Sequence, residues 1–302
     1  MTALTIFAPA KLNLALAVSP EIIGGKHLLQ SVFTTIDLTD ELVFEYQQDR
    51  STALRIRMDF APELPQIVIA QPKNIIYQAL RAFESRFDCK LTGALSIRVK
   101  KNIPTQAGLG GGSSDAAATL LAAQQLSGIK PKQAELASIA AELGADVAFF
   151  LEGGCALMGG HGETMIEKLY LPQLDIVLVK PNQGLSTARV YQQFSKSPQL
   201  ASGLTSMVKL LKTPQQDKQA TTVNLVRLLS NNLTDAAETL APEIIQISEA
   251  LEQQPGIIKA MLTGSGSTVF AIADNSRAAQ AAALHFETLG FWAKACKTTS
   301  DS

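Results

Sequence analysis

The sequence predicts an α+β protein built from two domains. Its 302 residues, 46% hydrophobic and 18% charged, are enough to bury a sizeable core. In the second half, helix and strand patterns come in blocks, which favours a split βαβ layer over a doubly wound sheet. A glycine-rich turn at Gly159, Gly160 and Gly162 precedes a new apolar strand. We therefore expect an N-terminal domain over residues 1–160 and a C-terminal domain over residues 161–302.

The N-terminal domain is expected to begin with strands. Residues 4–18 alternate in part, with Leu12 and Leu14 on one side and Lys11 and Asn13 on the other, which is typical of a half-buried strand. Further segments are rich in Ile, Val and Leu and also alternate, so they are expected to be strands. These segments are residues 27–38, 40–46, 53–59 and 95–103.

Three helices are expected in the same domain. Residues 74–87 carry apolar residues at helical spacing behind Asn74, a plausible N-cap. Residues 113–128 form the clearest helix, with Ser and Asp as cap candidates and Gly128 as its stop. Residues 132–144 repeat this pattern and are expected to end at Gly144.

The C-terminal domain is expected to begin with a strand and to return to strands near its end. A polar stretch over residues 211–223 is expected to be flexible. The expected elements, in chain order, are a strand at 175–181, helices at 223–233 and 243–254, a strand, glycine turn and strand over 256–274, a helix at 276–290 and a short strand at 291–298.

Composition argues against several classes of function. The net charge of −1, without a basic stripe, does not suit a nucleic-acid binder. Cys89, Cys155 and Cys296 lack metal-ligand or disulfide spacing and are interpreted as small apolar residues of a reducing compartment. The apolar N-terminus has no basic region before it and contains Lys11, and no later segment suits a membrane span. The expected location is the cytoplasm.

The stretch "PTQAGLGGGSSDAAA", residues 104–118, is the strongest local signal. Four glycines, Gly108 and Gly110 to Gly112, are followed by Ser113 and Ser114. The stretch follows a predicted strand and opens a predicted helix, so unpaired N–H groups and the positive helix end meet there. Glycines let the backbone wrap closely around an anion. The loop is therefore predicted to bind phosphate, although a tight strand-to-helix connection is the alternative.

Spacing separates this loop from three other phosphate loops. A Walker A loop needs GK[ST] at its end, and no lysine follows Gly112. A dinucleotide fingerprint starting at Gly108 needs glycine or alanine where Ser113 stands. A protein-kinase glycine loop joins two strands, whereas this one runs into alanines. Spacing alone does not name the ligand.

The motif "PTQAGLGGGSSDAA" resembles the second motif of the GHMP kinases, a superfamily of small-molecule kinases that hold ATP with this loop. "APAKLNLALAV" near the N-terminus and "LTGSGSTVFAI" near the C-terminus are similar to the other two motifs. Together with "FTTIDLTDEL" and "LGADVAFF", their order is most similar to the family that phosphorylates 4-diphosphocytidyl-2-C-methyl-D-erythritol. The resemblance covers nearly the whole chain and implies a GHMP kinase fold with a C-terminal ferredoxin-like domain.

The resemblance implies a catalytic base, Asp146, with Lys11 beside it. On the residues alone, Asp146 is a lone acid between Gly144 and an apolar run, and an N-cap is the competing interpretation. ATP and Mg²⁺ are the implied cofactors, with Ser114 at the metal and phosphates and no carboxylate ligand chosen. The implied ATP-binding residues are Pro104, Gly108, Leu109, Gly110, Gly111, Gly112, Ser113 and Ser114.

The implied acceptor site contains one departure from the family pattern. The family has "DGYH" where this chain reads "GGKH", so His27 is kept but Lys26 replaces an aromatic ring. Tyr191 takes the place of a second ring, and a lysine can still cover a base through a cation–π contact. The implied substrate-binding residues are Asn13, His27, Asp146, Thr187, Tyr191, Gly264, Ser265 and Gly266.

The predicted reaction is phosphorylation of the 2-hydroxyl of the cytidyl compound, in the non-mevalonate route to isoprenoid precursors. Two alternatives stay open: a GHMP kinase for another small alcohol, and a nucleotide-binding homologue without catalysis. The only partner expected is a small-molecule substrate, and the chain is expected to be a monomer or a weak homodimer.

Overall fold

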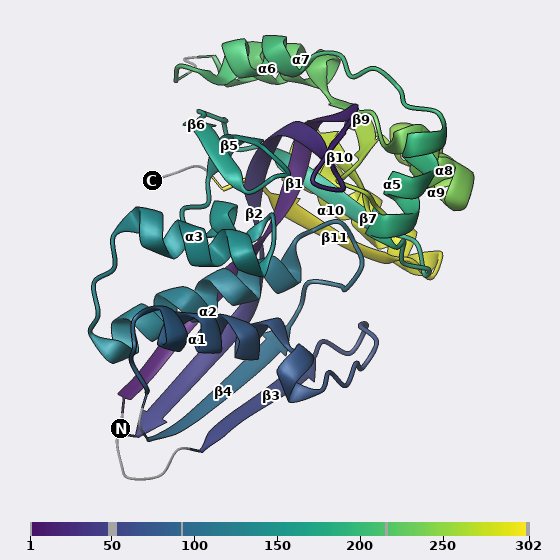
Figure 1. Cartoon of the computed structure of the whole chain (residues 1–302). Coiled ribbons are helices and arrows are strands. Elements are labelled where there is room, and N and C mark those ends of the chain that lie inside the picture. The colour runs from purple at the N-terminus through teal and green to yellow at the C-terminus, as the bar shows by residue number, and fades with distance from the viewer. Residues whose placement is uncertain (1, 48–52, 92, 215–216, 300–302) are drawn as a thin grey trace. The chain divides into compact units, whose positions relative to one another are not determined.

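The computed structural model describes residues 2–47, 53–91, 93–214 and 217–299 (Figure 1). These residues form two compact units, and neither is continuous in sequence. Unit 1 comprises residues 1–10, 38–104 and 110–152, and unit 2 comprises residues 11–37, 105–109 and 153–302. The units interleave because two long strands, β1 (Thr2–Ile23) and β2 (Lys26–Gln47), each contribute residues to both. The expected domain boundary at residue 160 stays a prediction.

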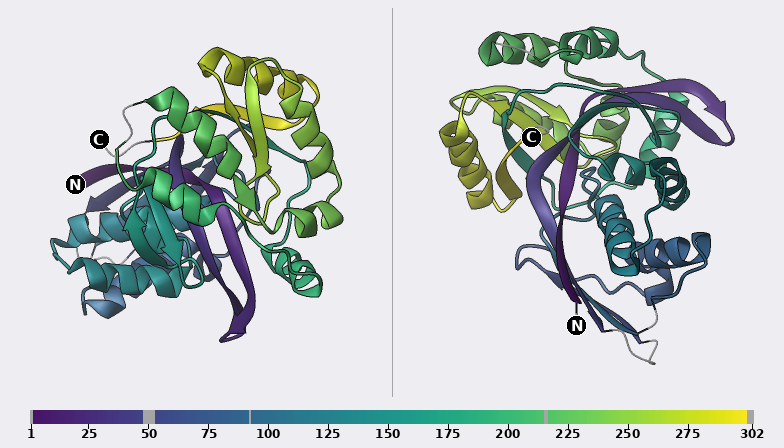
Figure 2. Two further views of the ribbon diagram at one scale, coloured as in Figure 1. Left: turned by 90° about the horizontal axis from the view of Figure 1, so that it is seen from above. Right: turned by 90° about the vertical axis from the view of Figure 1, so that its left-hand side faces the viewer.

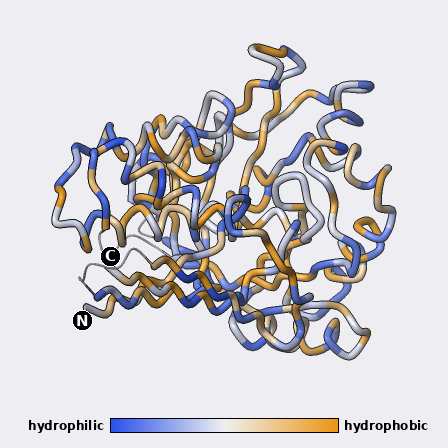
Figure 3. Tube along the Cα trace, turned by 60° about the horizontal axis from the view of Figure 1, so that its bottom comes forward, coloured by the Kyte–Doolittle hydropathy of each residue, from blue (hydrophilic) through white to orange (hydrophobic). Residues whose placement is uncertain are grey.

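In unit 1, strands of a sheet that has seven strands in the described part of the chain lie against a group of helices. Strand β4 (Ala94–Lys101) pairs antiparallel with residues 41–47 of β2 and parallel with β3 (Leu54–Phe60). Buried and exposed residues alternate along β4, and Figure 3 shows hydropathy alternating along strands of the chain. The helices gathered on one side of these strands are α1 (Ile75–Arg86), α2 (Gly111–Ser127), α3 (Gln133–Leu143) and α4 (Val147–Phe150). A 3-10 turn, η1 (Gln71–Lys73), precedes α1.

The ends of the unit 1 helices confirm most of the predicted caps. The Asn74 side chain accepts a hydrogen bond from Ile76 N at 2.9 Å, as an N-cap does. Gly128, at φ +71°, ends α2, and Gly144 ends α3. The predicted Ser or Asp cap of α2 is wrong, because the helix begins earlier and Gly110 stands at the N-cap without any side-chain hydrogen bond.

The two long strands differ from prediction in two ways. Residues 27–38 and 40–46 were expected to be separate strands, but β2 runs through both (Figure 2). The half-buried pattern expected for β1 is wrong over its middle, where residues 10–16 are buried on both faces. Alternation of polar and apolar residues indicates a strand, but it does not show what covers the polar face.

Unit 2 contains a four-stranded antiparallel sheet of the ferredoxin-like type. Its strands are β7 (Asp175–Lys180), β9 (Ile257–Leu262), β10 (Val269–Ala273) and β11 (Trp292–Lys297), in the spatial order β11-β7-β10-β9. With helices after β7 and after β10, the element order is the split βαβ pattern that the sequence predicted. The last helix, α10 (Ser276–Thr288), packs on this sheet together with α9 (Glu243–Glu252).

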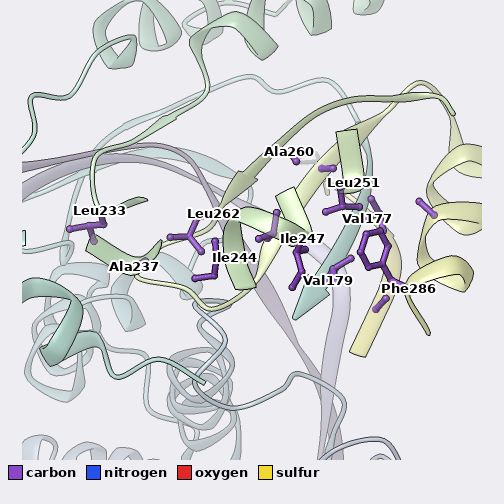
Figure 4. Close-up of a cluster of buried hydrophobic side chains, with 14 of the residues drawn as sticks. Val177, Val179, Leu233, Ala237, Ile244, Ile247, Leu251, Ala260, Leu262 and Phe286 are labelled. Carbon is purple, nitrogen blue, oxygen red and sulfur yellow. The ribbon is translucent and has the colours of Figure 1, made fainter. Parts of the chain in front are cut away.

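The core of unit 2 lies between that sheet and its helices (Figure 4). Val177 and Val179 from β7 meet Ile247 and Leu251 from α9 and Phe286 from α10. Leu16 and Val18 of β1 belong to the same cluster, so the N-terminal strand helps to build the C-terminal core. The remaining helices of the unit are α5 (Thr187–Lys196), α6 (Leu204–Leu211), α7 (Lys218–Leu228) and α8 (Thr234–Leu240).

Several elements of unit 2 differ from the sequence prediction. The helix expected over 223–233 instead begins at Lys218, inside the stretch expected to be flexible, and ends at Leu228. A short strand, β8 (Ser230–Asn231), follows it and pairs in parallel with Ala15 and Leu16 of β1. Strands β5 (Cys155–Gly159) and β6 (Thr164–Lys168) were not predicted. The seven-stranded sheet of the described residues contains β3-β4-β2-β1-β8 in that order, together with β5 and β6. Within the described ranges, none of the helices has the length and apolar character needed to span a bilayer.

Candidate active site

Lys11 and Asn13 form a buried polar pair on β1. Their side chains point to the same side of the strand, and Lys11 Nζ donates to Asn13 Oδ1 at 2.6 Å. Lys11 Nζ also lies 4.6 Å from the centre of the Phe33 ring, a distance that suits a cation–π contact. Because a buried ammonium must be compensated, these contacts hold the cation in place.

The first half of the glycine loop is hydrogen-bonded to the same strand and to Thr268, the residue before β10. Leu109 O accepts a hydrogen bond from Lys11 N at 2.9 Å, and Ala107 O accepts one from Thr268 N at 3.2 Å. Gly108, between them, has φ +77°, and a Cβ there would lie 2.5 Å from Thr263 O. This position therefore needs glycine both for its backbone conformation and for space.

The loop after β9 covers the Lys11–Asn13 pair. Asn13 N donates to Thr263 Oγ1 at 3.0 Å. A Cβ on Gly264 would lie 3.2 Å from Asn13 Oδ1 and 3.5 Å from Lys11 Nζ, so the bare backbone of this loop approaches both side chains. Residues from the three motifs thus meet inside unit 2: Lys11 and Asn13 from the first, Gly108 from the second, and Gly264 from the third.

The same rear loop reaches the start of α5. Ser265 Oγ and Thr187 Oγ1 are 2.9 Å apart and share a hydrogen bond. Ser265 and Gly266 are buried, whereas Thr187 is exposed at the first turn of its helix. The structure therefore brings Thr187 to the predicted loop.

In unit 1, the start of α2 has the character of an anion site. Gly110 has φ +72° and provides no side-chain cap, and the first turn contains no acidic residue. The first N–H groups of the helix therefore lack partners within it and carry its partial positive charge. Ser114 Oγ is buried and has no hydrogen-bond partner among the described residues. Pro104, Gly111, Gly112 and Ser113, also predicted to bind ATP, lie in the same unit.

A buried ionic cluster at the base of this helix was not predicted. Lys101 Nζ, at the end of β4, donates to carboxylate oxygens of both Asp40 and Asp115, the latter at 2.6 Å. Asp40 Oδ1 also accepts from Asn102 N at 2.6 Å and from Ile103 N at 2.9 Å. Asp40 on β2 and Asp115 on α2 thus fix the strand that leads into the loop and the helix that leaves it.

The charges in this cluster are unequal, because two carboxylates share one ammonium. Burial raises the pKa of Asp115 to about 7, against the opposing effect of Lys101 and with a further increase from Asp40. Burial lowers the pKa of Lys101, but its two carboxylate partners outweigh that effect and raise it overall. Lys101 therefore stays charged, and Asp115 is the group that titrates near neutral pH.

Asp146 stands at the N-cap position of α4, but its side chain makes no capping hydrogen bond. It is partly buried and follows Gly144, where a Cβ would lie 4.0 Å from Ser113 Oγ. The turn that carries Asp146 is therefore close to the first turn of α2, within the same unit.

The predicted acceptor residues His27 and Tyr191 lie together in unit 2. Their ring centres are 5.9 Å apart, and Phe194 lies 5.5 Å from His27 in an edge-on arrangement. His27 Nδ1 donates to Ser19 O at 2.7 Å, and its Nε2 is 2.7 Å from Ser195 Oγ. Lys26 is exposed next to His27, at the end of the β1–β2 hairpin.

Sequence reasoning missed the side chains that support these residues. Ser31 and Thr263, both bound to Asn13, and Lys101 with its two carboxylates were not singled out. For Lys101, a signal was present: a lysine ends a strand directly before the loop, and an aspartate follows its serines. Ser31 and Thr263 carried no comparable signal, because their roles depend on which strands become neighbours.

Comparison with protein families gives two matches. The profile described as GHMP kinases N terminal domain matches residues 74–154, and the one described as GHMP kinases C terminal matches residues 218–288.

Similar proteins cover nearly the whole chain. A 4-diphosphocytidyl-2-C-methyl-D-erythritol kinase of Desulfitobacterium hafniense (strain Y51) is 37% identical, covering 91% of this chain and 89% of its own. One from Polaromonas sp. (strain JS666 / ATCC BAA-500) is 38% identical, with 88% and 82% covered. A crystal structure titled 4-(cytidine 5'-diphospho)-2C-methyl-D-erythritol kinase matches with a TM-score of 0.78 and 29% identity, covering 99% of this chain and 100% of that one.

Proposed function

The chain belongs to the GHMP kinases, and from that premise we propose that it transfers the γ-phosphate of ATP to the 2-hydroxyl of 4-diphosphocytidyl-2-C-methyl-D-erythritol. The similar proteins described above are named as kinases of this compound. The reaction belongs to the non-mevalonate route to isoprenoid precursors. Membership of the GHMP kinases implies the use of ATP.

One observation carries the proposal: the buried Lys11, the glycine loop and the rear loop, from three distant motifs, meet in unit 2. Lys11 N binds the loop at Leu109 O, and Gly264 lies over Lys11 Nζ. A lysine whose backbone binds a phosphate loop and whose ammonium faces a second glycine loop suits stabilisation of charge on a transferred phosphoryl group.

The proposed roles follow from chemistry. Asp146 receives the proton of the acceptor hydroxyl, and Lys11 stabilises the charge that develops on the γ-phosphate. Asn13 keeps one amide N–H beyond the one it gives to Ser31, and this N–H is available for the acceptor hydroxyl. The N–H groups at the start of α2 bind the phosphates of ATP.

Residues of α2 suit the Mg²⁺ that accompanies ATP in such transfers. Ser114 Oγ is a buried oxygen without a partner among the described residues, and hydroxyl oxygens are acceptable Mg²⁺ ligands. Mg²⁺ keeps several waters and binds phosphates directly, so it does not need a cage of protein carboxylates. When bound, it would neutralise phosphate charge.

The rings near His27 support the cytidyl substrate, whereas Lys26 supports a different acceptor. His27 and Tyr191 provide a polar ring and a stacking surface close together. Lys26 favours a second candidate, a GHMP kinase for a different alcohol, because an exposed lysine gives less selectivity for a base than an aromatic ring would. The predicted cytoplasmic location and monomer or weak homodimer stay predictions.

The test is ATP consumption by the purified chain with the cytidyl compound, run in parallel with mevalonate, homoserine and galactose. We expect turnover with the cytidyl compound alone, and its loss in Asp146→Asn with ATP binding kept. Turnover with one of the other alcohols alone would establish the second candidate. Full turnover by Asp146→Asn would exclude Asp146 as the base.

A further inference from the structure

Ser31 lies at the end of a buried hydrogen-bond chain that leads to Lys11. It is on β2 and is fully buried. Its Oγ donates to Ala15 O at 2.6 Å and accepts a hydrogen bond from Asn13 Nδ2 at 2.9 Å. Because a carbonyl oxygen only accepts, the Ser31 proton is committed to Ala15, and its lone pairs face the Asn13 amide.

This arrangement decides which way the Asn13 amide points. With Nδ2 on Ser31, Oδ1 is placed on the opposite side, where it accepts from Lys11 Nζ at 2.6 Å and from Thr263 Oγ1 at 3.4 Å. The reversed amide would bring its NH₂ group against the Lys11 ammonium, with donor facing donor, and its oxygen against a serine whose proton is already used. Both contacts would be lost in a buried site, where unsatisfied polar groups are costly.

We propose that Ser31 is a positioning residue that fixes the Lys11 ammonium by setting the orientation of the Asn13 amide. The inference rests on the proposed function, in which Lys11 acts on the transferred phosphate. Without the Ser31 hydroxyl, the amide rotates more freely, and Lys11 loses a fixed acceptor. The ammonium then occupies several positions, so its interaction with the transition state weakens, while the loop that binds ATP is unchanged.

The first test compares Ser31→Ala and Ser31→Cys with wild type. Cysteine fills the space of serine but hydrogen-bonds weakly, so it separates the hydrogen bond from the cavity. We expect both variants to lower kcat about 10- to 100-fold, the range for a small misplacement of a catalytic group, with the KM for ATP within about twofold. Normal kcat in Ser31→Cys would overturn the proposal.

The matched control is Thr34→Val, which removes another buried hydroxyl from the same strand. This hydroxyl donates to Thr35 O. The kcat of Thr34→Val is expected to stay within about twofold of wild type.

The second test is a double-mutant cycle with Asn13→Ala. If Ser31 acts through Asn13, then Ser31→Ala has almost no further effect on kcat once Asn13 is alanine, and the double variant matches Asn13→Ala within about twofold. Independent, multiplicative losses would show a merely structural role and overturn the proposal.

The proposed function is tested separately, by the acceptor specificity of the wild-type protein. If wild type phosphorylates another alcohol instead, the cycle is run on that alcohol, and the inference about Ser31 is still decided. A parallel cycle of urea denaturation midpoints needs no substrate. We expect the destabilisation of the double variant to be smaller than the sum of the single losses, and additive losses would contradict the link between Ser31 and Asn13.

Discussion

Asp115 is a single residue whose titration should be visible in the stability of the whole protein. Its pKa is raised from 3.8 to about 7, so the folded protein holds a proton that the unfolded chain has already released. The free energy of unfolding should therefore fall as pH rises through this window, by on the order of 1 to 4 kcal/mol, and stay low above it. This fall should be reduced in Asp115→Asn, because asparagine cannot ionise. Lys101 keeps its pairing with Asp40 in this variant.

The measurement is the urea denaturation midpoint of wild type and Asp115→Asn at several pH values between 4.5 and 8. The matched control is Asp59→Asn, the same chemical change at an exposed carboxylate paired with Arg57. It should leave the slope with pH as in wild type. An unaltered slope in Asp115→Asn would mean that another group carries the pH dependence.

Lys26 is the residue that bears on acceptor choice. It is exposed next to His27, in the segment "GGKH" for which the family resemblance implies "DGYH". If the acceptor is the cytidyl compound, Lys26→Tyr should lower the KM for it by about 2- to 10-fold, because aromatic stacking contributes roughly 0.5–1.5 kcal/mol. The KM for ATP should not change. Lys26→Ala is the control for loss of the lysine, and an increased acceptor KM in both variants would show that the lysine itself contacts the substrate.

Single residues were predictable where a motif carried them. Lys11, Gly108 and Gly264 were all expected from the sequence, and the structure brings them together in unit 2. Ser31 and Thr263 were not expected, since a serine or threonine in a strand looks the same whether it supports a catalytic lysine or faces solvent. Their partners lie 18 and 250 positions away from them in sequence, so no local pattern reports the contact.

The glycine loop and the helix after it provide a prediction about an element. Gly108 and Gly128 lie before and after α2 at φ +77° and +71°, but a Cβ at Gly108 would meet Thr263 O at 2.5 Å, whereas nothing lies within 4 Å at Gly128. Alanine at either position is strained by roughly 1 kcal/mol or more. Only Gly108→Ala must also displace the loop from its backbone neighbours.

We therefore expect Gly108→Ala to raise the KM for ATP at least about tenfold, equivalent to roughly 1.4 kcal/mol. Gly128→Ala should lower the melting temperature while leaving both KM values as in wild type. ATP titration by calorimetry together with steady-state kinetics distinguishes these results. Equal ATP affinity in the two variants would mean that the loop adjusts to an added methyl group.

Elements were predictable when they were long or had clear ends. Helix α2 and the cap at Asn74 were recognised because helix formers and a cap residue act locally. Strands β5 and β6 were missed because a glycine-rich turn between them looked like a linker, and β8 because two residues are too few to show a pattern. Each of these short strands is defined by its pairing with another strand. Strand β5 pairs with β2, β6 pairs with β5, and β8 pairs with β1.

At the scale of the whole molecule, the fold class followed from the order of strands and helices, but the interleaving of the units did not. Composition and periodicity locate elements along the chain. They do not show that residues 11–37 pack with residues 153–302. That assignment depends on strand pairing, such as Thr35 O with Thr299 N and Ala15 with Ser230.

This interleaving gives a test of the predicted boundary at residue 160. A fragment of residues 1–160 would keep Leu16 and Val18 but lose the α9, α10 and β7 side chains that bury them. Exposing each of these residues costs roughly 1.5–3 kcal/mol, and β1 would also lose its pairing with β8. We expect the separate fragments 1–160 and 161–302 to lack a cooperative urea transition, and to regain one only when both are mixed. A cooperative transition in fragment 1–160 alone, at the midpoint of the intact chain, would show that residue 160 is a folding boundary and that the pairing of residues 11–37 contributes little to stability.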